Sequence, residues 1–231
     1  MKRQDFFVIL FIFLLFLPFF LSTSAYQFYL DFNKEHGMVM SFLKFAILAM
    51  LGELLGLRLK TGRYYHPRFG ILPRAIVWGF LGLTIKLAFI VFTKGTLGFL
   101  VYMGITDAPA AFAGNFSLER LFIAFCISAF MNSIYAPVMM MFHRITDTHI
   151  MNHGGSLVAL IKPIKVGKIL AGINWEAQWS FVFARTIPFF WIPMHTITFL
   201  LPESFQVLFA ALLGIALGVI LGIATRSEKL V

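Results

Sequence analysis

Long apolar segments, separated by short polar connections, are the main feature of the chain. A helix needs roughly 20 residues to cross a bilayer core of about 30 Å, and six segments reach or approach that length. Their residues do not alternate as strand residues do, and the segments exceed the roughly ten residues of a barrel strand. We therefore predict an all-α fold, a polytopic transmembrane helical bundle of about six spans. The expected spans are residues 6–21, 38–57, 72–92, 118–141, 179–200 and 207–224.

The pattern divides the chain into a short N-terminal segment, residues 1–25, and a single helical bundle, residues 26–231. Lys2 and Arg3, the apolar run that follows and the small residues at 22–25 are typical of a signal peptide. An apolar run of this length, continued by near-neutral residues, also serves as a membrane anchor. We favour a retained anchor, because cleavage would leave only five spans.

The composition supports a lipid-facing surface. Of all residues 60% are hydrophobic and 13% are charged, whereas a soluble domain carries roughly 25% charged residues. So little polar surface cannot cover a globule in water. The only cysteine, Cys126, excludes an internal disulfide and a cysteine-based metal site. We expect Cys126 to be a small buried apolar residue.

Basic residues are distributed unevenly between the two sides of the expected bundle. Of the 19 lysines and arginines, 14 lie on the side of the two termini and three on the other side, while Lys44 and Lys86 lie inside spans. The positive-inside rule then places both termini in the cytoplasm if the first segment is retained. The N-terminal segment lacks the character of a transit peptide, so we expect a plasma (inner) membrane protein.

The expected partners follow from the same distribution. Basic connections between apolar spans favour membrane lipids, with anionic headgroups at the cytoplasmic loops. No aromatic-basic motif typical of nucleic-acid binding joins these residues, so no nucleic acid is expected. The basic stretch at 156–172 reads as a segment lying on the membrane surface, although Pro163 interrupts it as one helix.

Three polar residues lie inside expected spans and are candidates for a pore or polar pathway: Glu53, Lys86 and Asn132. An ionisable residue at a helix centre costs about 2.5–3.5 kcal/mol on insertion scales. A Glu53–Lys86 ion pair between neighbouring helices would lower that cost and would line a polar cavity. The alternatives are a purely structural bridge, or a Glu53 carboxylate that reaches the cytoplasmic interface. Asn132 either bonds a neighbouring helix or lines a pathway.

Small residues and prolines in the spans predict close helix packing. Gly79 and Gly82 permit close approach of a neighbouring helix, and the GxxxG pattern at 214–218 is compatible with a homo-oligomer. Pro137 frees a backbone carbonyl inside its span. The remaining packing candidates are Trp191, Pro193 and Pro202.

The connection that begins near residue 142 holds the best candidates for catalysis or metal binding. His149 and His153 share a helical face if a helix continues that far, a spacing that can hold a metal ion. Gly154 and Gly155 predict a helix end directly afterwards, which favours solvated histidines. No GxSxG, P-loop or GxGxxG motif is present. We therefore expect no cofactor and no metal.

Several short motifs follow one another in a characteristic order. A Gly-Glu pair comes first, then a Gly-Phe-Leu-Gly motif, an Asn five residues before a Pro, and a Trp-Ile-Pro motif. These motifs are Gly52 with Glu53, Gly79 to Gly82, Asn132 with Pro137, Trp191 with Pro193, and finally Phe199 with Pro202. In this order they resemble the Mpv/PMP family of mitochondrial and peroxisomal membrane proteins, as a prokaryotic-type relative over roughly residues 38–222. Lys86 stands where many members have His, and Met131 where the family has Asp.

The resemblance implies a small helical bundle with four conserved helices that forms a pore or influences small-molecule permeability. With the polar residues inside spans, it makes a channel-like or small-solute permeability protein the leading expectation. The alternative is a membrane scaffold or accessory protein that transports nothing. A membrane-embedded enzyme that uses Asp147, His149 and His153 is the third expectation.

Overall fold

The computed structural model describes residues 3–227, with side chains described as far as residue 220. Over these residues the chain is 84% helical and contains no strand, which confirms the all-α prediction. The first elements are α1 (Arg3–Leu21), α2 (Thr23–Glu35), α3 (Gly37–Lys44), the π-helical turn η1 (Phe45–Ala49) and α4 (Met50–Thr61). Next come α5 (Ile71–Tyr102), α6 (Ala108–Ala113), α7 (Leu118–Asn152), the 3-10 turn η2 (Leu157–Leu160), α8 (Val166–Ala171) and α9 (Trp175–Ala177). The last described elements are the π-helical η3 (Gln178–Trp191), α10 (Ile192–Leu200) and α11 (Glu203–Ser227).

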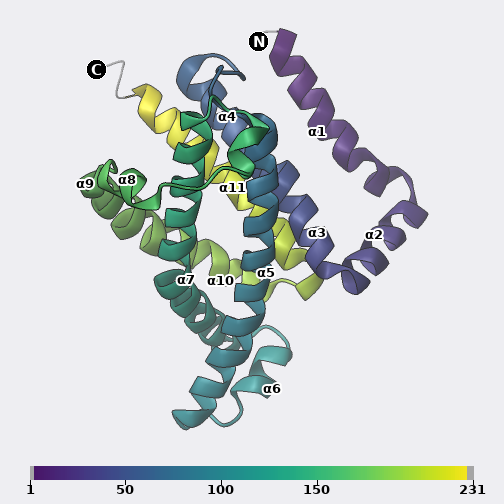
Figure 1. Ribbon diagram of the computed structural model, residues 1–231. Helices are drawn as coiled ribbons and strands as arrows, with labels where there is room; N and C mark the ends of the chain where they lie inside the picture. Colours follow the sequence, from purple (N-terminus) through teal and green to yellow (C-terminus); the bar gives the residue numbers. More distant parts are fainter. Residues whose placement is uncertain (1–2, 228–231) are drawn as a thin grey trace.

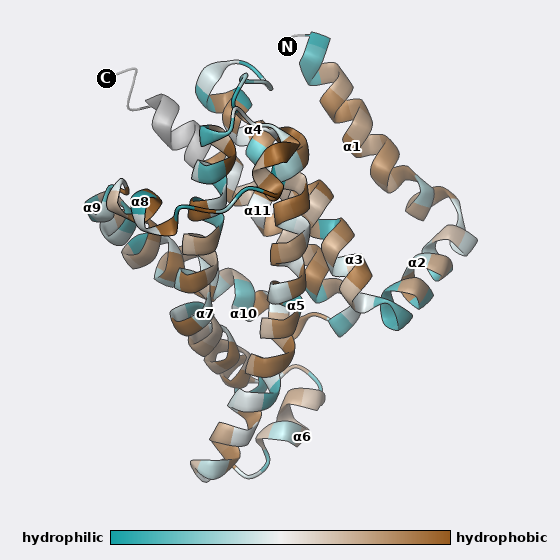
Figure 2. Cartoon of the chain, viewed as in Figure 1, coloured by the Kyte–Doolittle hydropathy of each residue, from teal (hydrophilic) through white to brown (hydrophobic). Residues whose placement is uncertain are grey.

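Five helical segments within the described residues are long and apolar enough to cross a membrane, which indicates a membrane protein. They are α1, the joined segment Gly37–Thr61, α5, α7 and α11. Figure 2 shows the apolar character along α1, α5 and α7, and polar residues at the connection after α4. The sixth expected span, residues 179–200, corresponds to η3 and α10. Polar side chains such as Arg185 and His195 lower its mean hydropathy, and it is not among the five.

The long helices α5 and α7 run side by side and form the central pair of the bundle (Figure 1). The joined segment of α3, η1 and α4 packs against α5, and α11 packs against α4, while α10 packs against α7. Helices α1 and α2 form an outer arm next to α3 (Figure 1). The start of α1 is held to the end of α4, because Arg58 Nε donates to Asp5 Oδ1 at 2.7 Å.

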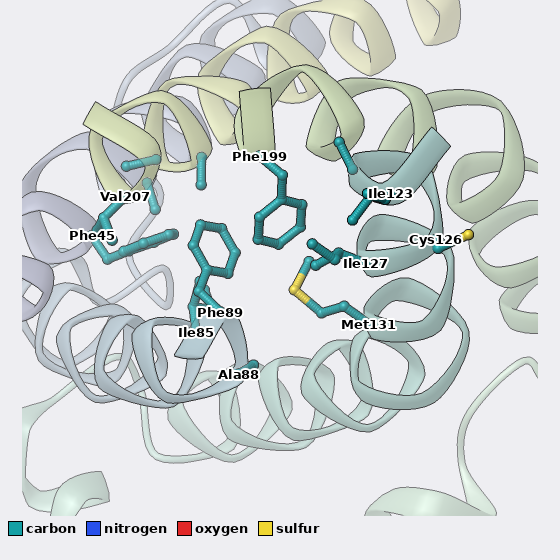
Figure 3. Packing of buried hydrophobic residues seen from close by; sticks show 14 of the residues in the cluster. Phe45, Ile85, Ala88, Phe89, Ile123, Cys126, Ile127, Met131, Phe199 and Val207 are labelled. Carbon is teal, nitrogen blue, oxygen red and sulfur yellow. The ribbon is translucent and has the colours of Figure 1, made fainter. Parts of the chain in front are cut away.

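The apolar core lies where η1, α5, α7, α10 and α11 meet, as Figure 3 shows. Phe89 of α5 and Phe199 of α10 pack against each other at its centre, with ring centroids 5.1 Å apart and the rings tilted at 54°. Cys126 is 9% exposed and belongs to this core, as a small apolar residue would. Other side chains of the core are Phe45, Ile85, Ile123, Ile127, Met131 and Val207.

Glycines allow two helix pairs to approach closely. A Cβ at Gly79 would lie 2.5 Å from the Phe42 ring, and one at Gly82 would lie 2.6 Å from the Ser41 carbonyl oxygen, so α3 crosses α5 directly over these glycines. A Cβ at Gly218 would lie 2.7 Å from the Gly52 carbonyl oxygen, where α11 meets α4. Such contacts let backbones pack without side chains between them.

The connections that carry most basic residues lie at one end of the bundle. Gly70, at the end of the connection after α4, contacts Gly155, which follows α7. The start of α1 joins the same end through the bond between Asp5 and Arg58. Figure 1 shows the start of α1 and the described end of α11 near this end of the molecule.

Candidate functional site

A buried ionic cluster joins three helices of the bundle. The Arg74 guanidinium of α5 donates from one nitrogen, Nη1, to Glu53 Oε2 of α4 and to Asp147 Oδ2 of α7, both at 2.6 Å. The Arg74 side chain is only 6% exposed. Its Nε also donates to the Phe69 carbonyl oxygen at 2.7 Å, which fixes the guanidinium in position.

The second oxygen of Glu53 receives two further donors. Trp78 Nε1 donates to Glu53 Oε1 at 2.6 Å, and His143 Nε2 lies 2.8 Å from the same oxygen. Because a carboxylate only accepts, the His143 ring donates in this contact. Arg74 and Trp78 are four residues apart on α5, as are His143 and Asp147 on α7, so each helix presents one face to the cluster. We call Glu53, Arg74, His143 and Asp147 the ionic cluster.

The formal charges in the ionic cluster nearly balance. Arg74 carries one positive charge against the carboxylates of Glu53 and Asp147, so the sum is −1 with a neutral His143 and 0 with a protonated one. Charges inside a membrane protein are tolerated where they pair with one another in the bundle interior. The cluster is therefore an ion network in which Arg74 is the cation that both carboxylates share, and removing Arg74 breaks both of its ion pairs.

Three residues of the ionic cluster carry groups that could bind a metal ion. One ligand atom each from Glu53, His143 and Asp147 lies within 4.8 Å of the others. The Arg74 guanidinium already contacts both carboxylates, so a cation there would have to displace it. The arrangement thus fits an ion network better than a metal centre.

A cavity of about 560 Å³ extends from the ionic cluster into the bundle between α4, α5, α7, η3, α10 and α11. Exposed Lys60 and Arg144 line it on the side of the cluster. Asn132, Trp191 and His195 line it farther inside, among apolar residues. The cavity therefore combines apolar walls with a few placed polar groups, the usual composition of small-molecule sites.

A neutral hydrogen-bonded chain surrounds Asn132. Its Nδ2 donates to the Ser128 carbonyl oxygen at 2.8 Å, and Ser128 Oγ donates to the Ile192 carbonyl oxygen at 2.7 Å. His195 Nδ1 lies 3.1 Å from Asn132 Oδ1, which accepts, so this ring nitrogen donates. In the neutral ring His195 Nε2 is then a hydrogen-bond acceptor. The chain links α7 to α10 at the wall of the cavity.

The expected Glu53–Lys86 pair does not form. Lys86 Nζ contacts Glu203 Oε1 at 2.9 Å instead, and the Glu203 side chain is 78% exposed. Lys86 also lies beside Gly37, at the level where α3 and α11 begin. Its ammonium therefore reaches the edge of the bundle, and Lys86 is not among the residues that line the 560 Å³ cavity.

The remaining packing candidates from the sequence lie within helices, at helix ends or in the wall of the cavity. Pro137 lies inside α7, which continues through it, and Pro193 lies in the first turn of α10. Pro202 separates α10 from α11. Trp191 lines the cavity, and its buried Nε1 has no hydrogen-bond partner among the described residues.

Sequence reasoning missed Arg74 and His143 as members of the site. Arg74 lies near the start of the expected span 72–92 and is counted with the basic residues of the connection before it, and His143 lies in the connection after the fourth expected span. The available signal was the spacing of four between Arg74 and Trp78 and between His143 and Asp147, which puts polar side chains on one helical face. No protein-family model, no curated protein and no solved structure matches the chain.

Proposed function

We propose that the chain is a channel-like, small-solute permeability protein of the plasma (inner) membrane, with the 560 Å³ cavity as part of the solute path. The observation that supports this is a cavity inside a bundle of apolar helices, with mostly apolar walls and a few polar groups placed in them. Polar and ionisable groups that face the interior of such bundles commonly mark solute or ion pathways. The proposed relationship to the Mpv/PMP family agrees with this function.

The size of the cavity limits the solutes to small ones. A volume of about 560 Å³ falls within the range of roughly 300–1,000 Å³ seen for small-molecule sites. Inorganic ions and neutral solutes the size of glycerol fit this volume, and proteins do not.

The test is a flux assay on purified protein in liposomes, with a variant that fills the cavity. Gly214 of α11 lines the cavity, and a Cβ built there has no neighbour within 4 Å, so Gly214→Phe is chosen to add bulk inside the cavity. Gly95→Phe on α5 is the matched control, because Gly95 also has no neighbour within 4 Å and does not line the cavity. We expect the wild type and Gly95→Phe to release ions or glycerol and Gly214→Phe to release them several-fold more slowly. The proposal is refuted if liposomes without protein release the solutes as fast as liposomes that contain the wild type.

The ionic cluster favours a second candidate, a membrane scaffold or accessory protein. Both oxygens of Glu53 are already engaged by donors, which suits a structural role that joins α4, α5 and α7. If the chain is a scaffold, the wild type and both variants should be folded and monodisperse and show no flux in the assay. A defined partner should then co-purify with the protein.

A further inference from the structure

A second cavity, of about 460 Å³, lies between the C-terminal end of α7 and the segment that contains α8. Exposed side chains and polar groups line most of it, in contrast to the core. We call it the basic pocket, and it is lined by Arg144, Thr148, His149, Asn152, His153, Pro163, Lys165, Lys168, Ile169, Gly172 and Ile173.

The charges in the basic pocket all have one sign. Arg144, Lys165 and Lys168 contribute three cations, and no aspartate or glutamate lines the pocket. Arg74 and Lys86 show the usual arrangement elsewhere in the bundle, since each contacts a carboxylate. Among the described residues none of the three pocket cations forms an ion pair, so their charge is available to a ligand.

The floor of the pocket is held in place by hydrogen bonds to the backbone. His149 is 4% exposed, and its Nε2 donates to the Ala159 carbonyl oxygen at 3.0 Å. His153 Nδ1 donates to the His149 carbonyl oxygen at 2.8 Å, and the two rings lie 4.3 Å apart. Because a carbonyl only accepts, these bonds fix both ring orientations. The pocket is thus a formed cavity with a fixed wall and a cationic rim.

Apolar side chains surround the lysines of the pocket on the exposed surface. Ile161 is 82% exposed, and Ile164 and Val166 are also exposed. Basic residues among exposed apolar ones are typical of segments that lie in the headgroup region of a membrane. A segment of this kind would bring the pocket to the depth at which lipid phosphates occur.

We propose that the basic pocket binds a phosphate group, carried by an anionic phospholipid headgroup or by free phosphate. Arg144, Lys165 and Lys168 form no ion pair among the described residues and are opposite in charge to such a group, and lysines bind phosphate as point charges. Asn152 adds an amide that can donate to a phosphate oxygen.

The test uses full-length protein in an uncharged detergent and the variant K165Q/K168Q. K162Q is the matched control, because Lys162 lies on the same exposed segment but does not line the pocket. One arm titrates inorganic phosphate calorimetrically. The other arm measures, by native mass spectrometry, how much phosphatidylglycerol is retained from an equimolar mixture with phosphatidylcholine.

We expect binding to weaken about fivefold for each lysine removed, since one lysine near an anionic surface contributes about 1 kcal/mol. K162Q should bind like the wild type, and K165R/K168R should retain binding because it keeps both charges. Binding in the lipid arm alone identifies a headgroup, and binding in the phosphate arm identifies free phosphate. The proposal is overturned if neither probe binds the wild type, or if K162Q loses as much affinity as K165Q/K168Q. Equal elution profiles of all variants check that the fold is retained.

Discussion

Replacing Arg74 with glutamine tests whether the ionic cluster holds the bundle together. The change removes the guanidinium that contacts Glu53 and Asp147, both at 2.6 Å. Glutamine is neutral and shorter than arginine, so the two carboxylates lose their shared cation. Their side chains are only 16% and 17% exposed, and water cannot replace the lost contact fully.

The expected cost follows from the burial of the two carboxylates. Breaking a buried ion pair by removing one partner costs about 3–5 kcal/mol, because it leaves an uncompensated buried charge. For a chain of this size each kcal/mol lowers the melting temperature by about 2–4 °C, so Arg74→Gln should lower it by about 6–20 °C. Asp147→Asn should cost less, because it keeps the Arg74–Glu53 pair.

The assay is thermal unfolding of purified protein in one detergent, followed by circular dichroism. Arg63→Gln is the matched control. It makes the same chemical change at a residue that is exposed in the connection after α4. If Arg74→Gln melts within about 2 °C of Arg63→Gln, or if Asp147→Asn is the more damaging change, the cluster does not contribute as argued.

Two further predictions test helix packing and orientation. Gly79→Ala should destabilise the folded protein by about 1–3 kcal/mol, because its Cβ would meet the Phe42 ring at 2.5 Å. Gly95→Ala is the control on the same helix, because its Cβ meets nothing within 4 Å and should not destabilise the protein. Melting curves of the two variants test this prediction. In a Cys126→Ser background, Tyr65→Cys places a thiol on an exposed connection, and a membrane-impermeant thiol reagent should label it only after the cells are opened. Labelling in intact cells would reverse the proposed orientation.

The fold could be predicted because the apolar segments mark the helices directly, but their ends could not. Helix α5 runs Ile71–Tyr102, ten residues beyond the expected end at 92, because buried Thr96 and Leu100 continue its packed face past Lys94. Helix α7 runs Leu118–Asn152 and includes His143 and Asp147, which hydropathy assigned to a connection. In both helices tertiary contacts stabilise helical turns that are too polar for hydropathy to assign them to a membrane span.

The pairing of the charged residues could not be predicted. The sequence shows which face of a helix a residue lies on, but not which residue of the neighbouring helix lies opposite it. Glu53 was expected to pair with Lys86, but Arg74 lies at its level instead. Arg74 and Lys86 are 12 residues apart on α5, which is about 18 Å along a helix. Lys86 therefore reaches Glu203 at the edge of the bundle.

The polar groups of the cavity divide into two kinds, according to whether their hydrogen-bonding atoms are already engaged. Both oxygens of Glu53 accept bonds from neighbouring helices, so substituting Glu53 changes stability as well as any flux. His195 has Nδ1 bound to Asn132, while its Nε2 and the buried Trp191 Nε1 have no hydrogen-bond partner among the described residues. A solute in the cavity would therefore meet its recognition groups near α10. For this reason flux is better tested by filling the cavity at Gly214 than by removing a charge from the ionic cluster, where a folding defect and a blocked path give the same result.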